Sequence, residues 1–193
     1  MGFNSLCQRS FLRMPRLLQL LLCLLPTAAM AAEEEQPPML IWRAAGTEGG
    51  AIDAVLGGVT LAPAAVGVFV DTRVHRIGRE RFRALYQVFD SNASNPMGRC
   101  GAGREIHLFV YELTPPKPIE RGSILISSCL ESVFLASQNS GSPDSDSDFS
   151  SVIWQDDGFT IEGWDIGSGA SASRHYILRN GHFVPTHSGE GNR

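Results

Sequence analysis

The sequence predicts an all-β protein, a single antiparallel domain folded as a sandwich, a barrel or a strongly bent meander, with one disulfide. Three observations predict it. Apolar and polar residues alternate with period two along several stretches of the chain, a pattern that turns one face of a strand to the core and the other to water. Turn-forming dipeptides separate these stretches, and only two cysteines lie beyond an N-terminal export signal. With 193 residues, 43% of them hydrophobic, the chain can bury a core of ordinary size.

Residues 1–31 have the features of a cleaved secretory signal: arginines, then a short apolar run, then a small-residue site that ends at Ala31. The run over residues 17–25 is about half the roughly 20 residues that a membrane-spanning helix needs. A lipoprotein anchor would require a small residue before Cys23, where Leu22 stands, and a twin-arginine signal would require adjacent arginines. We therefore expect a periplasmic or secreted protein that does not span the membrane.

Removal of this segment leaves Cys100 and Cys129, which an oxidising compartment is expected to join in a structural disulfide. A redox pair is the alternative, but the C-x-x-C spacing is missing. The glycine-rich stretch 98–103 superficially resembles a phosphate-binding loop. Its glycine spacing does not fit one, and we interpret these glycines as room for close packing around the disulfide.

The polar stretch 32–38 predicts a mobile leader, residues 39–186 a β-rich domain, and residues 187–193 a flexible tail. Ordered structure is expected to start at residues 39–42. The Gly- and Ala-rich stretch 44–65 fits either a short helix or a loop.

Alternation begins at Val66 and continues to His75, then resumes after Gly78, which suits a turn between two strands. Residues 81–89 also place apolar side chains at helical spacing, so a helix competes there, but the β-rich surroundings favour a strand. Residues 105–111 predict the next strand, which the prolines of residues 114–118 end.

Two shorter apolar pieces follow at residues 124–126 and 133–135. Asp157-Gly158 and Asn180-Gly181 each separate two apolar triplets and predict type I′ hairpins. The count is eight to ten short strands. The similarity of the two terminal hairpins leaves a propeller-like arrangement open.

Charge is unevenly distributed. Without the three arginines of residues 1–31, 13 of the 16 basic residues remain against 20 acidic ones, a formal net charge of −7, which argues against nucleic acid as a partner. Residues 71–104 carry seven arginines against three acidic residues, whereas residues 131–165 carry eight acidic residues and neither lysine nor arginine. Each segment is either a solvated face, or one of two halves that attract each other across the fold, or a charged patch that steers a partner of opposite sign.

The acidic segment contains Asp144, Asp146 and Asp148 at alternate positions, as a calcium-binding loop begins. Phe149 stands where such a loop needs glycine, and Gln155 where it needs a bidentate glutamate, so calcium is the weaker interpretation. We expect no metal and no cofactor. Instead we predict that these three aspartates form a binding loop that projects from the sheet and meets a basic surface.

Catalytic signatures are few. The chain beyond residue 31 lacks the G-x-S-x-G, H-E-x-x-H and S-x-x-K motifs. Five histidines could act as bases in a dispersed site, although each fits a half-exposed strand or tail residue better: His75, His107, His175, His182 and His187.

This profile of an export signal, one disulfide, a small β domain and no catalytic signature resembles that of exported bacterial inhibitors and immunity proteins that block a cell-wall hydrolase. The resemblance is one of profile alone and implies a non-enzymatic binding protein with a protein partner. The alternatives are an envelope hydrolase with a dispersed active site and a structural component of an envelope assembly. Clustering of a histidine with a carboxylate or hydroxyl would favour the hydrolase.

Overall fold

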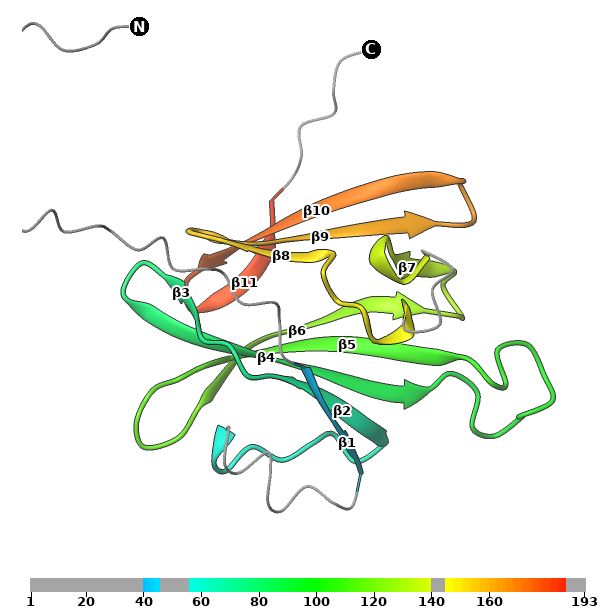
Figure 1. Cartoon of the computed structure of the whole chain (residues 1–193), viewed down its shortest axis with the longest axis horizontal. Helices are drawn as coiled ribbons and strands as arrows, with labels where there is room; N and C mark the ends of the chain where they lie inside the picture. Colours follow the sequence, from blue (N-terminus) through cyan, green and yellow to red (C-terminus); the bar gives the residue numbers. More distant parts are fainter. Residues whose placement is uncertain (1–39, 46–55, 140–144, 187–193) are drawn as a thin grey trace, which may run out of the picture. The chain divides into compact units, whose positions relative to one another are not determined.

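A computed structural model describes residues 40–45, 56–139 and 145–186, all within one compact unit, Pro37–Arg193. Their regular structure is almost entirely strand (Figure 1). The strands are β1 (Leu40–Ala44), β2 (Ala65–Asp71), β3 (His75–Ile77), β4 (Glu80–Asp90), β5 (Arg104–Glu112), β6 (Ile119–Ser128), β7 (Val133–Leu135), β8 (Val152–Gln155), β9 (Gly158–Asp165), β10 (Ala170–Arg179) and β11 (His182–Pro185). Two short 3-10 turns, η2 (Ser137–Asn139) and η3 (Ser145–Ser147), lie between β7 and β8.

The strands form one open antiparallel sheet in the order β1-β2-β4-β5-β6-β7-β9-β10-β11, with β3 paired to β4 and β8 to β9. Almost every strand therefore pairs with its neighbour in sequence, as in a meander. This confirms the predicted all-β class and matches the bent meander among the three architectures expected. Within the described residues, no helix is long and apolar enough to cross a membrane.

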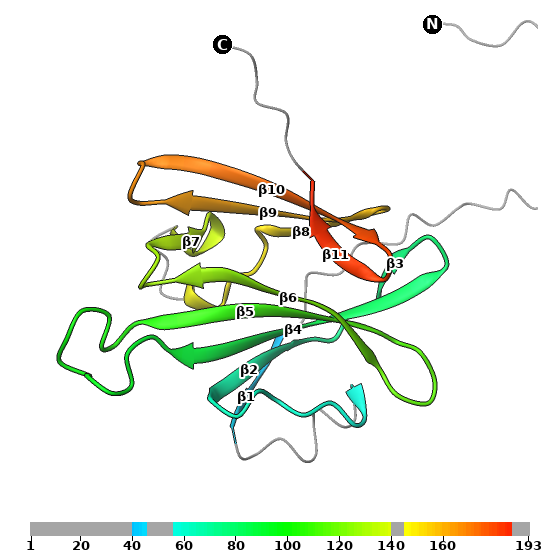
Figure 2. The ribbon, with the colours of Figure 1, turned by 180° about the vertical axis from the view of Figure 1, so that it is seen from behind.

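The sheet folds over on itself, so that β4, β5 and β6 face β8, β9 and β10 (Figures 1 and 2). We call these two facing parts of the sheet its arms, and side chains from both meet in the main core. Phe82 of β4 packs edge-on against Phe183 of β11, with ring centroids 5.3 Å apart. Phe159 of β9 is fully buried in the same cluster. Burial of these rings stabilises the bend, because each removes a large apolar area from water.

A second, smaller core lies on the other side of β2, β4 and β5. Leu56 and Leu61, from the loop before β2, cover Val68, Val70 and other residues of these strands. The centre of the sheet is thus buried on both faces, which explains why β4 has five consecutive buried residues, 84–88, where a one-sided strand would alternate buried and exposed positions.

The structure confirms most of the turns and strand ends that the sequence predicts. Gly78 (φ +59°) turns the chain from β3 into β4, and Asn180 and Gly181 both have positive φ between β10 and β11, as a type I′ turn requires. The region where helix and strand competed is strand β4. Strand β5 ends at Glu112, just before the prolines.

Two details of the prediction were wrong. The β8–β9 hairpin exists, but Gln155 pairs with Gly158, so the turn falls on Asp156 and Asp157. Gly158 is needed because a β-carbon there would lie 1.8 Å from the carbonyl oxygen of Tyr176 on β10. The alternation that began at Val66 also does not continue to His75: β2 ends at Asp71, and β3 starts only at His75.

The predicted signal (1–31), leader (32–38) and tail (187–193) lie outside the described residues, and so do Asp144 and residues 46–55 of the undecided stretch 44–65.

Candidate functional site

The predicted disulfide is present at one end of the sheet. Cys100 lies in the loop between β4 and β5, Cys129 follows β6, and their Cα atoms are 5.8 Å apart. Ser91 and Gly103 close the loop by a main-chain hydrogen bond of 3.1 Å. The carboxylate of Glu105 accepts hydrogen bonds from the Ser91 hydroxyl and the Leu130 main-chain nitrogen, which ties the two disulfide-bearing segments together a second time.

Glycines make this close packing possible, as predicted. A β-carbon on Gly103 would lie 2.7 Å from Cβ and 2.9 Å from Sγ of Cys129. Gly101 serves a different contact, since its β-carbon would meet the main-chain carbonyl of Pro96 at 2.0 Å. The loop is therefore a rigid, disulfide-linked wall. Its glycines are needed for close packing against Pro96 and Cys129.

This wall borders a hollow of about 510 Å³, here called the Trp42 hollow. Its volume lies within the range of roughly 300 to 1,000 Å³ that is usual for ligand pockets. Most of the lining is apolar, and residues from strands far apart in the sequence contribute to it. The lining residues are Trp42, Phe69, Val88, Ala102, Gly103, Arg104, Ile106, Ser127, Cys129, Phe134, Gln138 and Asp146.

The floor of the hollow is a row of residues in register across the sheet. Gly67 pairs with Val88, Val88 with Ile106, and Ile106 with Ser127. The indole of Trp42 fills the space above Gly67, and its ring centroid lies 4.6 Å from that of Phe69. Trp42 nevertheless keeps 44% of its surface exposed, so part of this lining residue is accessible to a ligand.

Of the three aspartates predicted to form a binding loop, Asp146 borders this hollow. It lies in η3, is exposed, and its main-chain carbonyl accepts a hydrogen bond of 3.1 Å from the side-chain amide of Gln138. Asp148 is half-buried and organises the loop: its carboxylate accepts the main-chain N–H of Ser150 at 2.8 Å. The structure thus places Asp146 and Asp148 in different roles.

The described part of this loop lies against the sheet, although the sequence predicts that it projects. Phe149 is buried and stacks on Tyr86 at a centroid distance of 4.1 Å. The hydroxyl of Ser137 donates to the main-chain carbonyl of Asp148 at 2.7 Å. The loop therefore holds Asp146 at a defined place beside the hollow.

Charges in the basic segment are partly neutralised within that segment. Arg104, which lines the hollow, is hydrogen-bonded to Asp90 on the neighbouring strand. Arg73 and His75 both pair with Asp71. Among the described residues, no hydrogen bond or ion pair reaches the carboxylate of Asp146, so the charge left unpaired at the rim is negative.

A second polar cluster centres on Asp71, which is fully buried at the end of β2. Its carboxylate accepts hydrogen bonds from the main-chain nitrogen of Arg73 at 2.9 Å and from Nε2 of His75 at 2.9 Å. Burial alone would raise the pKa of Asp71, but the hydrogen bonds from His75 and Arg73 outweigh it and hold this pKa below its ordinary value. The cluster fixes the sharp turn between β2 and β3.

The ring of His75 is further held by Trp154 of β8, which stacks on it with centroids 3.9 Å apart and planes 7° from parallel. Nε1 of Trp154 is buried without a hydrogen-bond partner among the described residues. His75 thus links the β2–β4 part of the sheet to β8. Because the carboxylate of Asp71 is fully hydrogen-bonded and the His75 ring is stacked on Trp154, this cluster is typical of a structural role.

Another histidine sits on the face of β10. Nδ1 of His175 lies 3.0 Å from the hydroxyl of Thr160, and Nε2 lies 3.4 Å from a carboxylate oxygen of Asp157. A serine-type triad places the carboxylate on Nδ1 and the nucleophile on Nε2, so this order is reversed. Asp157 is also 66% exposed, and none of the three residues lines the Trp42 hollow.

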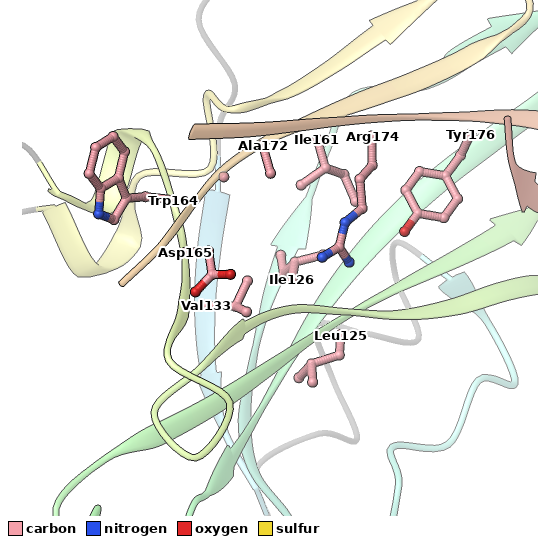
Figure 3. A pocket seen from close by; sticks show the side chains of 10 residues that line it. Leu125, Ile126, Val133, Ile161, Trp164, Asp165, Ala172, Arg174 and Tyr176 are labelled. Atoms are coloured by element: carbon pink, nitrogen blue, oxygen red, sulfur yellow. The ribbon is translucent and has the colours of Figure 1, made fainter. Parts of the chain in front are cut away.

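A smaller hollow lies between β6 and the arm formed by β9 and β10 (Figure 3). Arg174 extends across it toward Ile126, while Tyr176 closes one side. Its volume of about 30 Å³ leaves room for little more than ordered water, since a cavity needs roughly 10–15 Å³ to hold one water molecule.

Over residues 40–45, 56–139 and 145–186, no three His, Cys, Asp or Glu side chains gather closely enough to hold a metal ion. The chain matches no family model, and no curated protein or solved structure matches it either. The fold and the hollow define a disulfide-linked, bent β-sheet protein with a preformed, aromatic-lined hollow at one end.

Sequence reasoning missed the aromatic members of the hollow, Trp42, Phe69 and Phe134, because they come from strands separated by up to about 90 positions. One signal was available: Gly67 interrupts an apolar strand, and a strand glycine often marks a close approach by another group. Asp71 gave a similar signal, as an acid within an apolar alternation.

Proposed function

We propose that the chain is an exported, non-enzymatic binding protein that recognises a protein partner at the Trp42 hollow. The single observation that carries this proposal is the hollow itself, a preformed space of about 510 Å³ lined by Trp42, Phe69 and Phe134. Exposed aromatic residues beside a concave, water-excluding surface are the usual anchors of protein interfaces.

The scaffold around the hollow supports rigid recognition. The disulfide at Cys100 and Cys129 holds one wall, and Phe149 holds the acidic loop against the core. A preorganised site binds with little loss of conformational entropy. Such a site suits an inhibitor, which must bind its target tightly.

The partner that fits best is a cell-wall-directed hydrolase, which makes this chain an inhibitor or immunity-type protein. Hydrolases of this kind act on an anionic substrate and often carry basic surfaces. The acidic segment 131–165, with eight acidic residues and no basic ones, complements such a surface and would speed association.

Capture from the envelope fraction of the protein's own and competing cells tests this function. Wild type and Trp42→Ala serve as parallel baits, and bound proteins are identified by mass spectrometry. We expect a basic hydrolase to be retained by wild type and depleted at least tenfold on Trp42→Ala, and we expect the purified chain to slow that enzyme on cell-wall substrate. A captured enzyme whose activity the chain leaves unchanged contradicts the proposal.

One observation favours a hydrolase as the second candidate, namely the contact of His175 with Thr160 and Asp157. In that case the chain itself would cleave an envelope polymer, and His175→Ala would abolish the cleavage. The reversed order of the two partners on the ring and the exposure of Asp157 favour the binding protein instead.

A further inference from the structure

We propose that the Trp42 hollow receives an arginine side chain from the protein partner. The inference rests on the proposed function and adds the chemistry of recognition to it. Two features of the hollow carry it: a partly exposed aromatic wall, and a carboxylate at the rim that no other described residue pairs with.

The aromatic wall is built from Trp42 and Phe69, cross-strand neighbours on β1 and β2 whose rings are tilted by 51°. The ring of Trp42 packs directly on Gly67, so the backbone of β2 prevents it from moving closer to the sheet. A tryptophan face bound in this way attracts cations through the negative potential of its ring. Phe134, from β7, adds a third aromatic side chain to the lining.

The charged side chain without a partner at the rim is acidic. Among the described residues, the hollow is lined by one charge of each sign, Arg104 and Asp146. Arg104 is hydrogen-bonded to Asp90, whereas the carboxylate of Asp146 has no hydrogen bond or ion pair within the described residues. Gln138, through its hydrogen bond to the main-chain carbonyl of Asp146, holds the backbone of this residue at the rim of the hollow.

A site that combines an aromatic face with a carboxylate favours arginine over other side chains. The guanidinium group is planar, stacks on aromatic rings, binds a carboxylate through two parallel hydrogen bonds and is less strongly hydrated than an ammonium group. The apolar floor, Val88 and Ile106, suits the methylene stem of the same side chain. At about 510 Å³ the hollow also accommodates part of the loop that bears the arginine.

The test needs no knowledge of the partner. Nα-acetyl-arginine amide and its neutral isostere, Nα-acetyl-citrulline amide, are titrated separately into the isotope-labelled full chain, and the indole N–H resonance of Trp42 is followed by NMR. We expect the arginine probe to move this resonance and to bind about five- to tenfold more tightly than the citrulline probe. Raising the salt concentration should reduce the difference.

Two variants with the same change in charge identify the carboxylate. Asp146→Asn should bring the arginine probe down to the affinity of the citrulline probe. Asp156→Asn, in the exposed β8–β9 turn outside the hollow, should leave the difference intact.

Equal affinity for both probes overturns the inference and leaves an apolar site, to which the proposed function can still apply. Failure of both probes to move the Trp42 resonance also overturns it. A loss of discrimination in Asp156→Asn as large as in Asp146→Asn assigns the effect to general charge and overturns the role of Asp146. The proposed function fails separately, if wild type and Trp42→Ala capture the same proteins.

Discussion

The indole of Trp42 occupies the space that any side chain at position 67 would need. A β-carbon on Gly67 would lie 2.2 Å from Cη2 of the Trp42 ring and 2.8 Å from the carbonyl oxygen of Arg43. The first contact could be relieved by moving the ring, but the second is with the paired backbone of β1. The shape of the hollow therefore depends on a residue that has no side chain.

Gly67→Ala should displace Trp42 and reduce the free energy of unfolding by about 1–3 kcal/mol, the usual cost of overpacking. Chemical denaturation measures the stability, and the Trp42 indole resonance reports the displacement. Gly122→Ala is the matched control, because the nearest atom to its β-carbon is Cβ of Phe183 at 3.4 Å, an ordinary contact. Similar behaviour of the two variants would contradict the assigned role of Gly67.

The local parts of this fold were accessible from sequence. Asn180-Gly181 predicts its hairpin because the two residues alone determine the turn, and Cys100 and Cys129 are the only pairing left once residues 1–31 are set aside. The dipeptide Asp157-Gly158 predicts that Gly158 lies in a turn, whereas its actual constraint is the carbonyl of Tyr176 on the next strand. That contact depends on tertiary structure, which the local pattern does not encode.

The hollow could be predicted only in part. The charge of Asp146 and the composition of its loop, both local properties, indicate a binding residue in the sequence. The aromatic residues that line the hollow beside it come from β1, β2 and β7 and meet only when the sheet bends. Phe149 was considered only as a misfit in a calcium loop, although a large aromatic residue within a polar stretch was a signal for an anchor.

Asp71→Asn should destabilise the protein by about 3 kcal/mol, because a buried, paired carboxylate is lost while Arg73 and His75 keep their positions. Asp157→Asn, which alters an exposed carboxylate facing a histidine, should change stability by less than about 1 kcal/mol. Equilibrium denaturation of both variants at neutral pH makes the comparison. A small effect of Asp71→Asn would show that the cluster is not needed for folding.

The carboxylate of Asp71 should also make the free energy of unfolding depend on pH. Because the pKa of Asp71 is lowered in the folded state, its contribution is fully present above the unfolded value of about 3.9 and is lost as the pH falls through the folded value. Denaturation series of wild type and Asp71→Asn should therefore converge as the pH drops below about 4. Curves that remain parallel would contradict this assignment.

Reduction of the disulfide should lower the free energy of unfolding by about 3–4 kcal/mol in the chain-entropy model, given a separation of 29 residues between Cys100 and Cys129. It should also loosen the wall of the Trp42 hollow, which Cys129 lines. Thiol titration of the unfolded, non-reduced exported protein should find no free thiol. Two free thiols would contradict the pairing, and Cys100→Ser/Cys129→Ser provides the stability comparison without reductant.

Removal of the three loop charges should slow association with the captured partner. We expect Asp144→Asn, Asp146→Asn and Asp148→Asn together to reduce the association rate about tenfold at low salt, with a smaller effect near physiological ionic strength, where the Debye length is about 8 Å. Folding should be nearly unaffected, since the amide oxygen of an asparagine at position 148 can still accept the main-chain N–H of Ser150. Stopped-flow measurements at two salt concentrations give the association rates. A triple variant that associates at the wild-type rate at low salt would show that the loop is only solvated surface.

The central claim is that the partner binds at the Trp42 hollow, and the most direct test is the equilibrium affinity of the captured partner for two tryptophan variants. Trp42→Ala removes the aromatic wall, while Trp164→Ala removes a side chain of comparable exposure on β9 that does not line this hollow. We predict that Trp42→Ala weakens binding about 30-fold or more, as loss of an interface anchor does, and that Trp164→Ala changes it less than about threefold. Undiminished binding by Trp42→Ala, or equal losses in the two variants, would contradict the account.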